Sequence, residues 1–132
     1  MTMETLLRAA LLGWLKTDPV LAGRINTVAE EAPSRTAAPW LGVVASASRD
    51  WSTKDRRGRE IRVALELHCR GGDPASAAAT TAAIEARVEA LPKAQGGFAI
   101  AGITFLRARA EQRPGNLRAV LLEYRFRVLA AE

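Results

Sequence analysis

The chain opens with hydrophobic residues spaced as on one face of a helix. Across Met3–Leu15, apolar side chains recur at positions 6, 7, 10, 11, 14 and 15, which matches the 3.6-residue period of an amphipathic helix. Thr17, Asp18 and Pro19 interrupt this pattern. Because Asp is a common N-cap and Pro is favoured in a first helical turn, they predict a short helical turn up to Gly23.

Alternating apolar and polar residues indicate a β-hairpin in the middle of the chain. From 61 to 70, apolar residues occupy the odd positions and mostly polar residues the even ones, as in a half-buried strand. Trp40–Trp51 is rich in Val, Trp and small residues and is a second strand candidate. The polar stretch 52–58 between them ends in Gly58, which a tight reversal prefers. We therefore predict an antiparallel hairpin with an exposed tip.

The segments before this hairpin are less regular. A weak strand is expected from Arg24 to about Val28. Glu30–Pro39 contains two prolines together with Ser and Thr, and such residues favour turns over regular structure. This segment is predicted to be a surface loop.

The second half of the chain predicts a helix followed by another hairpin. Asp73 and Pro74 supply an N-cap and a first-turn proline for a helix that runs to about Leu91. Phe98–Arg109 and Leu117–Leu129 are predicted strands, separated by the turn-forming stretch 113–116.

The final predicted strand has two different faces. Apolar residues occupy the even positions from 120 to 128, whereas Glu123, Arg125 and Arg127 occupy odd positions. Only one face of an antiparallel sheet needs to be buried, so the charged face is expected to meet solvent or a partner.

This order of elements predicts an α+β fold. We expect an antiparallel, mainly four-stranded sheet made of two hairpins, with two helices packed on one face. A chain of 132 residues without a repeat or linker is expected to form a single domain, residues 1–132, around one hydrophobic core.

Composition excludes several classes of protein. The chain is 48% hydrophobic and 25% charged, as in ordinary folded proteins. No apolar run approaches the roughly 20 residues that a membrane span needs, so no membrane association is expected. The single cysteine, Cys69, cannot form an internal disulfide, and this favours synthesis in the cytoplasm.

The net charge of +5 and the pI near 10.3 come almost entirely from arginine. Such a surface could attract nucleic acid or an acidic protein face. Alternatively, an arginine-rich, lysine-poor and alanine-rich composition is what a GC-rich genome would encode. The charge is spread along the sequence, although arginines gather between Arg49 and Arg62, so a small basic nucleic-acid-binding module is the alternative function.

No residue pattern indicates catalysis. His68 is the only histidine, and its neighbour Cys69 would point to the opposite face of a strand, so the two cannot form a nucleophile pair. Gly71 and Gly72 precede a helix but lack the lysine and hydroxyl of a phosphate-binding loop. We predict no catalytic, cofactor or metal site, and an enzyme would require a pocket built between subunits.

Trp51 lies in sequence among arginines and a lysine and could act in two ways. Trp and Arg are enriched at protein interfaces, so Trp51 could anchor one. A basic patch with an aromatic residue could also stack on single-stranded nucleic acid, but such stacking usually employs several aromatic residues and this chain has few. A protein interface is therefore favoured.

The order of these features resembles the small tail completion proteins of long-tailed phages, the tail terminators that also occur in phage-derived gene transfer agents. The resemblance covers nearly the whole chain and is one of overall layout, not of a catalytic fingerprint. The segments that carry it are, in chain order, the helix Leu6–Leu15, the run 18–25, the loop with Pro33, the entry Ala38–Leu41, the tip Asp50–Lys54, the long strand Glu60–Arg70 with His68 before its turn, and the closing run 121–128.

The resemblance implies a structural virion protein that has no cofactor and is not an enzyme. It implies a ring, usually of six subunits, that caps the tail tube and meets the head-completion (stopper) protein. DNA would pass through its channel without sequence recognition. The protein would be part of the virion tail, assembled in the bacterial cytoplasm. The residues expected at the inter-subunit or tail-tube interface are Arg49, Trp51, Lys54, Arg56, Arg57, Arg59, Arg113, Glu123, Arg125 and Arg127.

Overall fold

A computed structural model describes residues 2–30, 37–71 and 74–131. The first helix, α1 (Met3–Lys16), is capped by Thr2, whose side chain accepts a hydrogen bond from the Thr5 amide. It buries Leu7, Leu11 and Leu15, which confirms the predicted amphipathic helix. The short helix α2 (Pro19–Ala22) follows, with Asp18 as its N-cap, as predicted.

In the described residues, the sheet has five strands and not four. In chain order they are β1 (Thr27–Ala29), β2 (Trp40–Asp50), β3 (Gly58–Arg70), β4 (Phe98–Arg113) and β5 (Leu117–Ala130). Their order in the sheet is β1-β2-β3-β5-β4. Both predicted hairpins form, and β3 pairs antiparallel with β5 to join them.

The additional strand, β1, runs parallel to β2 and makes the sheet mixed. The chain returns alongside the first three residues of β2, so that Thr27 pairs with Trp40 and Ala29 with Gly42. Three half-buried residues are too short to show an alternating pattern, which is why this segment gave only a weak strand signal.

The described part of the chain has three helices where two were expected, because α2 forms four residues of regular helix. The third helix, α3 (Pro74–Glu89), buries Ala77, Thr80, Ile84 and Val88. The predicted N-cap, Asp73, lies outside the described residues, as does most of the predicted loop 30–39. Within the described residues, no helix has the length and apolar character needed to cross a membrane.

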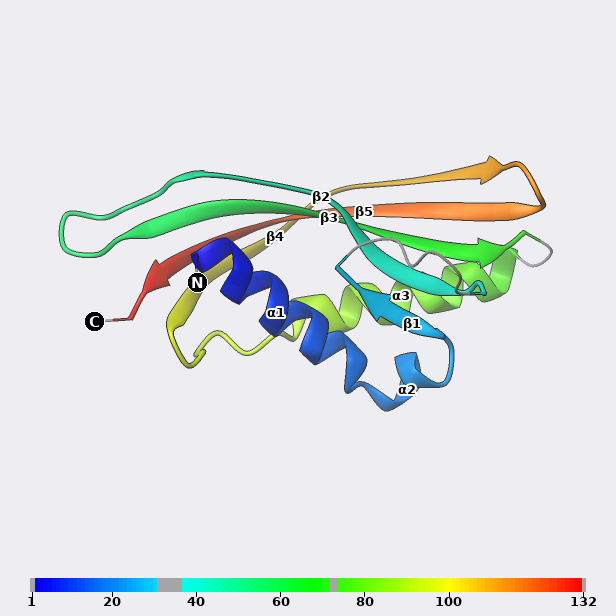
Figure 1. The fold of residues 1–132 in the computed structure, drawn as a ribbon, viewed down its shortest axis with the longest axis horizontal. Coiled ribbons are helices and arrows are strands. Elements are labelled where there is room, and N and C mark those ends of the chain that lie inside the picture. Colours follow the sequence, from blue (N-terminus) through cyan, green and yellow to red (C-terminus); the bar gives the residue numbers. More distant parts are fainter. Residues whose placement is uncertain (1, 31–36, 72–73, 132) are drawn as a thin grey trace.

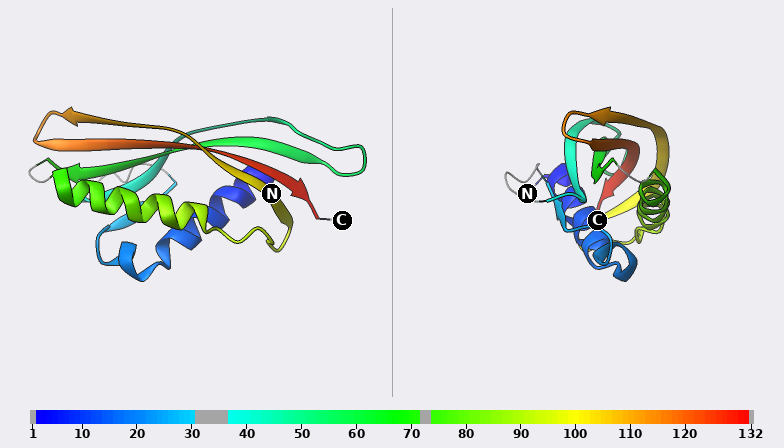
Figure 2. Two further views of the ribbon diagram at one scale, coloured as in Figure 1. Left: turned by 180° about the vertical axis from the view of Figure 1, so that it is seen from behind. Right: turned by 90° about the vertical axis from the view of Figure 1, so that its right-hand side faces the viewer.

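The helices lie on one face of the sheet, which curls over them (Figures 1 and 2). The core between the two layers contains Leu11 of α1, Ile84 of α3, Leu65 of β3 and Phe126 of β5, all fully buried. The sheet is long and twisted, and the β2–β3 and β4–β5 turns lie at opposite ends of the molecule (Figure 1). On the opposite face of the sheet, here called the outer face, the described residues form no layer of helices (Figure 2).

Candidate assembly surface

A cluster of charged residues occupies one end of the outer face. The strand register places Arg49, Glu60 and Arg127 in one row across β2, β3 and β5. The Nε of Arg127 donates to Glu60 Oε1 at 3.1 Å, and Arg49 donates to Glu60 Oε2. The Nε of Arg125 lies 3.6 Å from Glu60 Oε1. Three of the predicted interface arginines therefore converge on one carboxylate.

The Glu60 carboxylate is almost completely covered, with 2% of its side chain exposed. The hydrogen bond from Arg49 is the main reason why the pKa of Glu60 lies below its ordinary value, and Arg127 adds to this effect. Three guanidinium groups share one carboxylate, so the cluster has excess positive charge. We call Arg49, Glu60, Arg125 and Arg127 the arginine cluster.

Trp51 adjoins the arginine cluster. The guanidinium of Arg127 lies 5.4 Å from the centroid of the Trp51 ring, within the range of a cation–π contact. Trp51 is half-buried, and its amide donates to the carbonyl of Gly58 at 3.0 Å. The structure thus brings together four of the predicted interface residues: Arg49, Trp51, Arg125 and Arg127.

The remaining predicted residues of the β2–β3 end are dispersed. Arg59 forms ion pairs with Glu4 at 3.3 Å and with Asp50 at 3.4 Å. Arg56 donates from Nε and Nη2 to the carbonyl of Ala130, at 3.0 and 2.6 Å, so it ties the tip to the end of β5. Lys54 and Arg57 are exposed.

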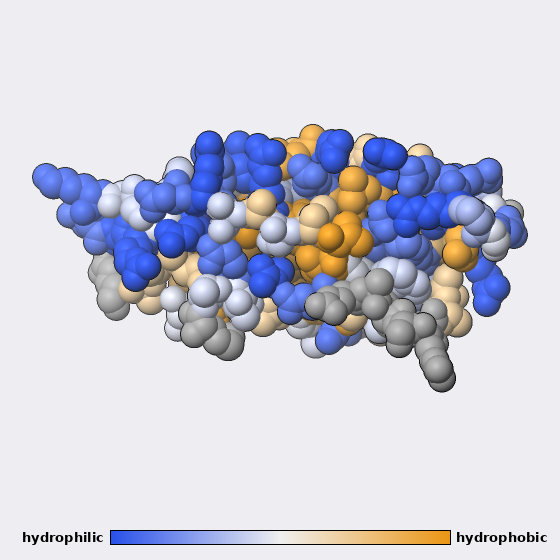
Figure 3. All heavy atoms as spheres, turned by 45° about the horizontal axis from the view of Figure 1, so that its top comes forward, coloured by the Kyte–Doolittle hydropathy of each residue, from blue (hydrophilic) through white to orange (hydrophobic). Residues whose placement is uncertain are grey.

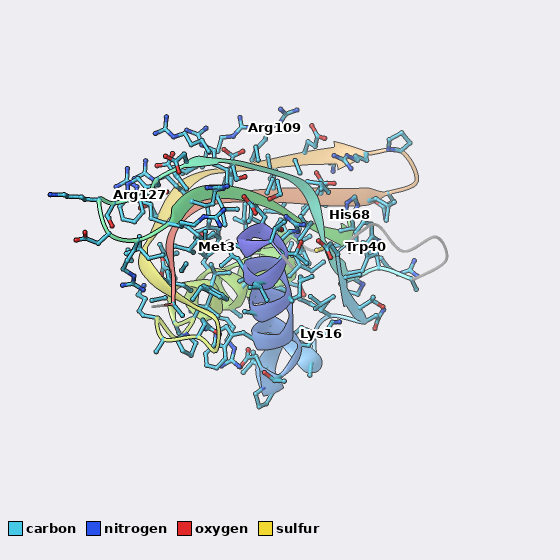
Figure 4. The ribbon with its side chains drawn as sticks, turned by 60° about the vertical axis from the view of Figure 1, so that its left-hand side comes forward. Met3, Lys16, Trp40, His68, Arg109 and Arg127 are labelled. Carbon is cyan, nitrogen blue, oxygen red and sulfur yellow. The ribbon has the colours of Figure 1, made fainter. Side chains whose placement is uncertain are left out.

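A second cluster lies toward the other end of the outer face. Arg113 donates to both carboxylate oxygens of Glu66, at 3.0 and 3.1 Å, and also contacts Glu111. These bonds, chiefly those to Glu66, raise the pKa of Arg113. His68 shares a 2.6 Å hydrogen bond with Glu66 and stacks on Trp40, with ring centroids 4.0 Å apart. Figure 4 shows the Trp40–His68 pair well separated from Arg127.

Sequence reasoning did not identify Glu60, Glu66 or Trp40 as members of these clusters. Glu123 was predicted, and it pairs with Arg107 at 3.5 Å between the two clusters. The prediction that the side chains of His68 and Cys69 point to opposite faces of their strand is confirmed. Cys69 lies in the core, where burial raises the pKa of its thiol, whereas His68 stacks on the outer face.

The described residues hold no group of three or more His, Cys, Asp or Glu side chains placed to bind a metal. A depression of about 530 Å³ among the described residues is lined by residues that include Arg24, Pro39, Cys69 and Thr80. Its lining includes no member of either charged cluster, although Pro39 and Cys69 are chain neighbours of Trp40 and His68.

These features describe a rigid sheet that keeps one face for its own core and presents preformed charged clusters on the other, an architecture suited to assembly. The sequence matches the family Tail completion protein gp17 over residues 9–129. Because this match spans most of the chain, the protein belongs to that family of structural, non-enzymatic proteins of virion tails, which confirms the predicted resemblance.

One similar solved structure is a chain of the virion of a native gene transfer agent particle. It is 26% identical in sequence, with a TM-score of 0.79, and the alignment covers 98% of this chain and 99% of that chain. No curated protein sequence matches this chain.

Proposed function

We propose that residues 1–132 form one tail-terminator domain, which assembles into a ring that caps the tail tube. The ring, of six subunits, joins the tube to the head-completion (stopper) protein and leaves a channel through which DNA passes without being read. Family membership and the full-length likeness to a chain of a gene transfer agent virion support this role. By the same likeness, the protein acts in the tail of a phage-like particle.

The observation that carries the proposal is the arginine cluster with Trp51 beside it. Glu60 holds Arg49, Arg125 and Arg127 in place before any partner arrives. Side chains that are already ordered lose little further conformational entropy on docking, and Arg and Trp are enriched among residues that dominate interface energies. The cluster is therefore suited to an acidic surface of a neighbouring subunit or of the tail tube.

A free nucleic-acid-binding module is the competing function, and the excess of arginine on the outer face is what favours it. Carboxylates are interleaved among these arginines, however, and the described ion pairs engage Glu60, Glu66, Glu111 and Glu123. Such carboxylates repel phosphate and suit a protein partner with mixed charges. Binding of the purified protein to duplex and single-stranded DNA across salt concentrations separates the two functions. Strong binding that weakens steeply with salt would favour the nucleic-acid module.

Deletion of the gene tests the proposed function. Without a terminator, we expect tails of abnormal length and heads without attached tails in electron micrographs of the particles. The wild-type gene supplied in trans should restore joined particles. A gene that carries Arg125→Glu together with Arg127→Glu should not restore them. Tails of normal length joined to heads in the deletion strain would refute the assignment.

A further inference from the structure

Both edges of the sheet are open along part of their length. At one edge, β1 pairs with β2 only as far as Gly42. At the other, the chain before β4 covers only its beginning, through the bridge between Ala94 and Ala99 and the bond from the Ile100 amide to the Lys93 carbonyl. Among the described residues, no strand pairs with the outward side of 43–50 or of 101–113. Open edges offer unpaired amides and carbonyls to another strand.

The two open edges also carry exposed hydrophobic side chains. Of the three large hydrophobic residues that are exposed in the described part of the chain, Val44 (45%) lies on β2 and Phe105 (43%) on β4, whereas Val20 (55%) lies on α2. The Phe105 ring is held edge-on against Tyr124, with centroids 5.6 Å apart. Figure 3 shows hydrophobic surface gathered near the middle of the molecule, between hydrophilic areas toward the two ends.

Charge does not protect the middle of either edge. Natural edge strands are commonly shielded from pairing by charged residues. Here the stretches 44–48 and 101–106 contain no charged residue, and arginines or acids begin only at Arg49 and Arg107. Each stretch includes small residues that let another backbone approach closely, such as Ala45 and Ala47 on β2 and Gly102 on β4.

The β2 edge is also held in position by the helix beneath it. The side chain of Ser48 donates to Glu4 of α1 at 2.7 Å, and Arg8 of α1 donates to the Ser46 hydroxyl at 3.4 Å. This edge is therefore ordered within the single chain, which lowers the entropic cost of pairing it with another strand.

The strand register places the two uncharged stretches at the same level of the sheet. Ala47 lies in the same row as Thr104, through Arg62 and Arg125 on the strands between them. Ser46 shares a row with Phe105 in the same way. Because each neighbouring pair among β2, β3, β5 and β4 is antiparallel, β4 runs opposite to β2. A rotation that brings β4 of one copy beside β2 of the next would therefore make an antiparallel pair.

We propose that the ring forms by edge pairing, in which residues 101–107 of one copy add to residues 44–50 of the next copy. The partner is thus a second copy of this chain, and the inference rests on the ring of the proposed function. The contact joins two different edges, so it is head-to-tail and can close a ring. It covers Val44 and Phe105 and leaves the outer face, with its arginine cluster, free for the tail tube or the head-completion protein.

Paired cysteines test this contact. Ala47→Cys and Thr104→Cys replace two exposed residues that share a row and a face. Within one chain they are three strand spacings apart, about 14 Å, which exceeds the Cα separation that a disulfide allows, about 7 Å. A disulfide between them must therefore join two copies. The only native cysteine, Cys69, is buried.

The double variant is supplied to the deletion strain, and particles are isolated, oxidised and run on non-reducing gels. We expect a ladder of covalent oligomers up to the size of the ring, which reductant abolishes. The pair Ala47→Cys with Val20→Cys is the matched control and should remain monomeric. The pairs Ala47→Cys with Gly102→Cys and Ala47→Cys with Arg107→Cys cover a shift to the neighbouring outer-face position in either direction.

Rings visible by electron microscopy without a ladder from any edge pair would overturn the edge contact and leave the proposed function intact. Particles that contain the protein but no ring would overturn both. A ladder of equal extent from the Val20→Cys control would show that cross-linking is not specific to the edges and would also contradict the proposal.

Discussion

Side chains on the two faces of the sheet are shielded from solvent in different ways. On the inner face, Val63 and Leu122 are fully buried beneath helices, as the core of a folded domain requires. On the outer face, Glu60 and His68 are also nearly covered, but by side chains of neighbouring strands. The first arrangement makes the chain fold. The second holds charged and aromatic groups in fixed positions at the surface, where another molecule can reach them.

The largest expected effect comes from placing a charge on the inner face. Val63→Asp or Phe126→Asp should abolish the cooperative thermal transition in circular dichroism, because an unpaired carboxylate in an apolar core costs several kcal/mol. Arg62→Asp is the matched control, one residue away on the outer face, and should leave a cooperative transition. If Val63→Asp melts like the wild-type protein, the inner face is not the core described here.

A charge reversal on the outer face should separate folding from assembly. In Arg125→Glu with Arg127→Glu, we expect a cooperative melt but a loss of joined particles of tenfold or more, since like charges would then surround Glu60. Thermal melts and counts of complete particles measure the two properties. Normal particle numbers from this variant would remove the arginine cluster from the interface.

Hydrophobic edge residues should behave differently from an equally exposed residue elsewhere. Val44→Asp and Phe105→Lys should each reduce ring formation several-fold, because each places an unpaired charge in the proposed contact. Val20→Asp should have no effect. Ring formation is followed by native mass measurement, and equal effects at all three positions would contradict a specific role for the edges.

Two neighbouring arginines at the tip of the β2–β3 hairpin are expected to differ in their effects on stability, and these effects are smaller. Arg56→Glu should lower the melting temperature by a few degrees, because it removes two hydrogen bonds to the Ala130 carbonyl, a loss of about 1 kcal/mol. Arg57→Glu changes an exposed side chain and should leave the melting temperature unchanged while weakening docking. Unchanged assembly in the Arg57→Glu variant would remove the tip from the interface.

The smallest expected effect is a pH dependence of the stability that Glu60 of the arginine cluster contributes. The pKa of Glu60 is lower in the folded state, mainly because of the hydrogen bond from Arg49. The stability from Glu60 is therefore fully present above the ordinary glutamate pKa and is lost as the pH falls through the lower folded value. As the pH is lowered from 6 to 2, the melting temperature of Glu60→Gln should fall less steeply than that of the wild-type protein. Parallel curves would show that Glu60 does not contribute.

Local patterns predicted the inner face well and the outer face only in part. The alternation in β5 and the turn residues at Gly58 and Gly115 were sufficient to predict burial and both hairpins. The arginine cluster could not be predicted in the same way, because Arg49, Glu60 and Arg127 meet only through the register of three strands. The three-residue strand β1 was expected as a weak strand. Its parallel pairing with β2 could not be predicted for a related reason, since that pairing is a long-range contact.

Trp14 also shows that local sequence patterns do not identify contacts between distant parts of the chain. Trp14 lies on the apolar face of α1, and its ring packs against the core. The ring is only partly buried, however. Its indole donates to the Arg87 carbonyl at 2.7 Å, and the Arg87 guanidinium stacks 3.3 Å from the ring centroid. No spacing in the sequence identifies a partner on a helix that lies more than seventy residues away.

The central claim is that one face of the sheet forms the core of this protein, whereas the other face and the edges form its assembly contacts. A cryo-electron microscopy reconstruction of intact particles would test this claim most directly. We expect a ring of copies at the head end of the tail tube, with β4 of each copy beside β2 of the next and the arginine cluster against a neighbouring protein. A ring held together by α1 and α3, with Arg125 and Arg127 left in solvent, would contradict it.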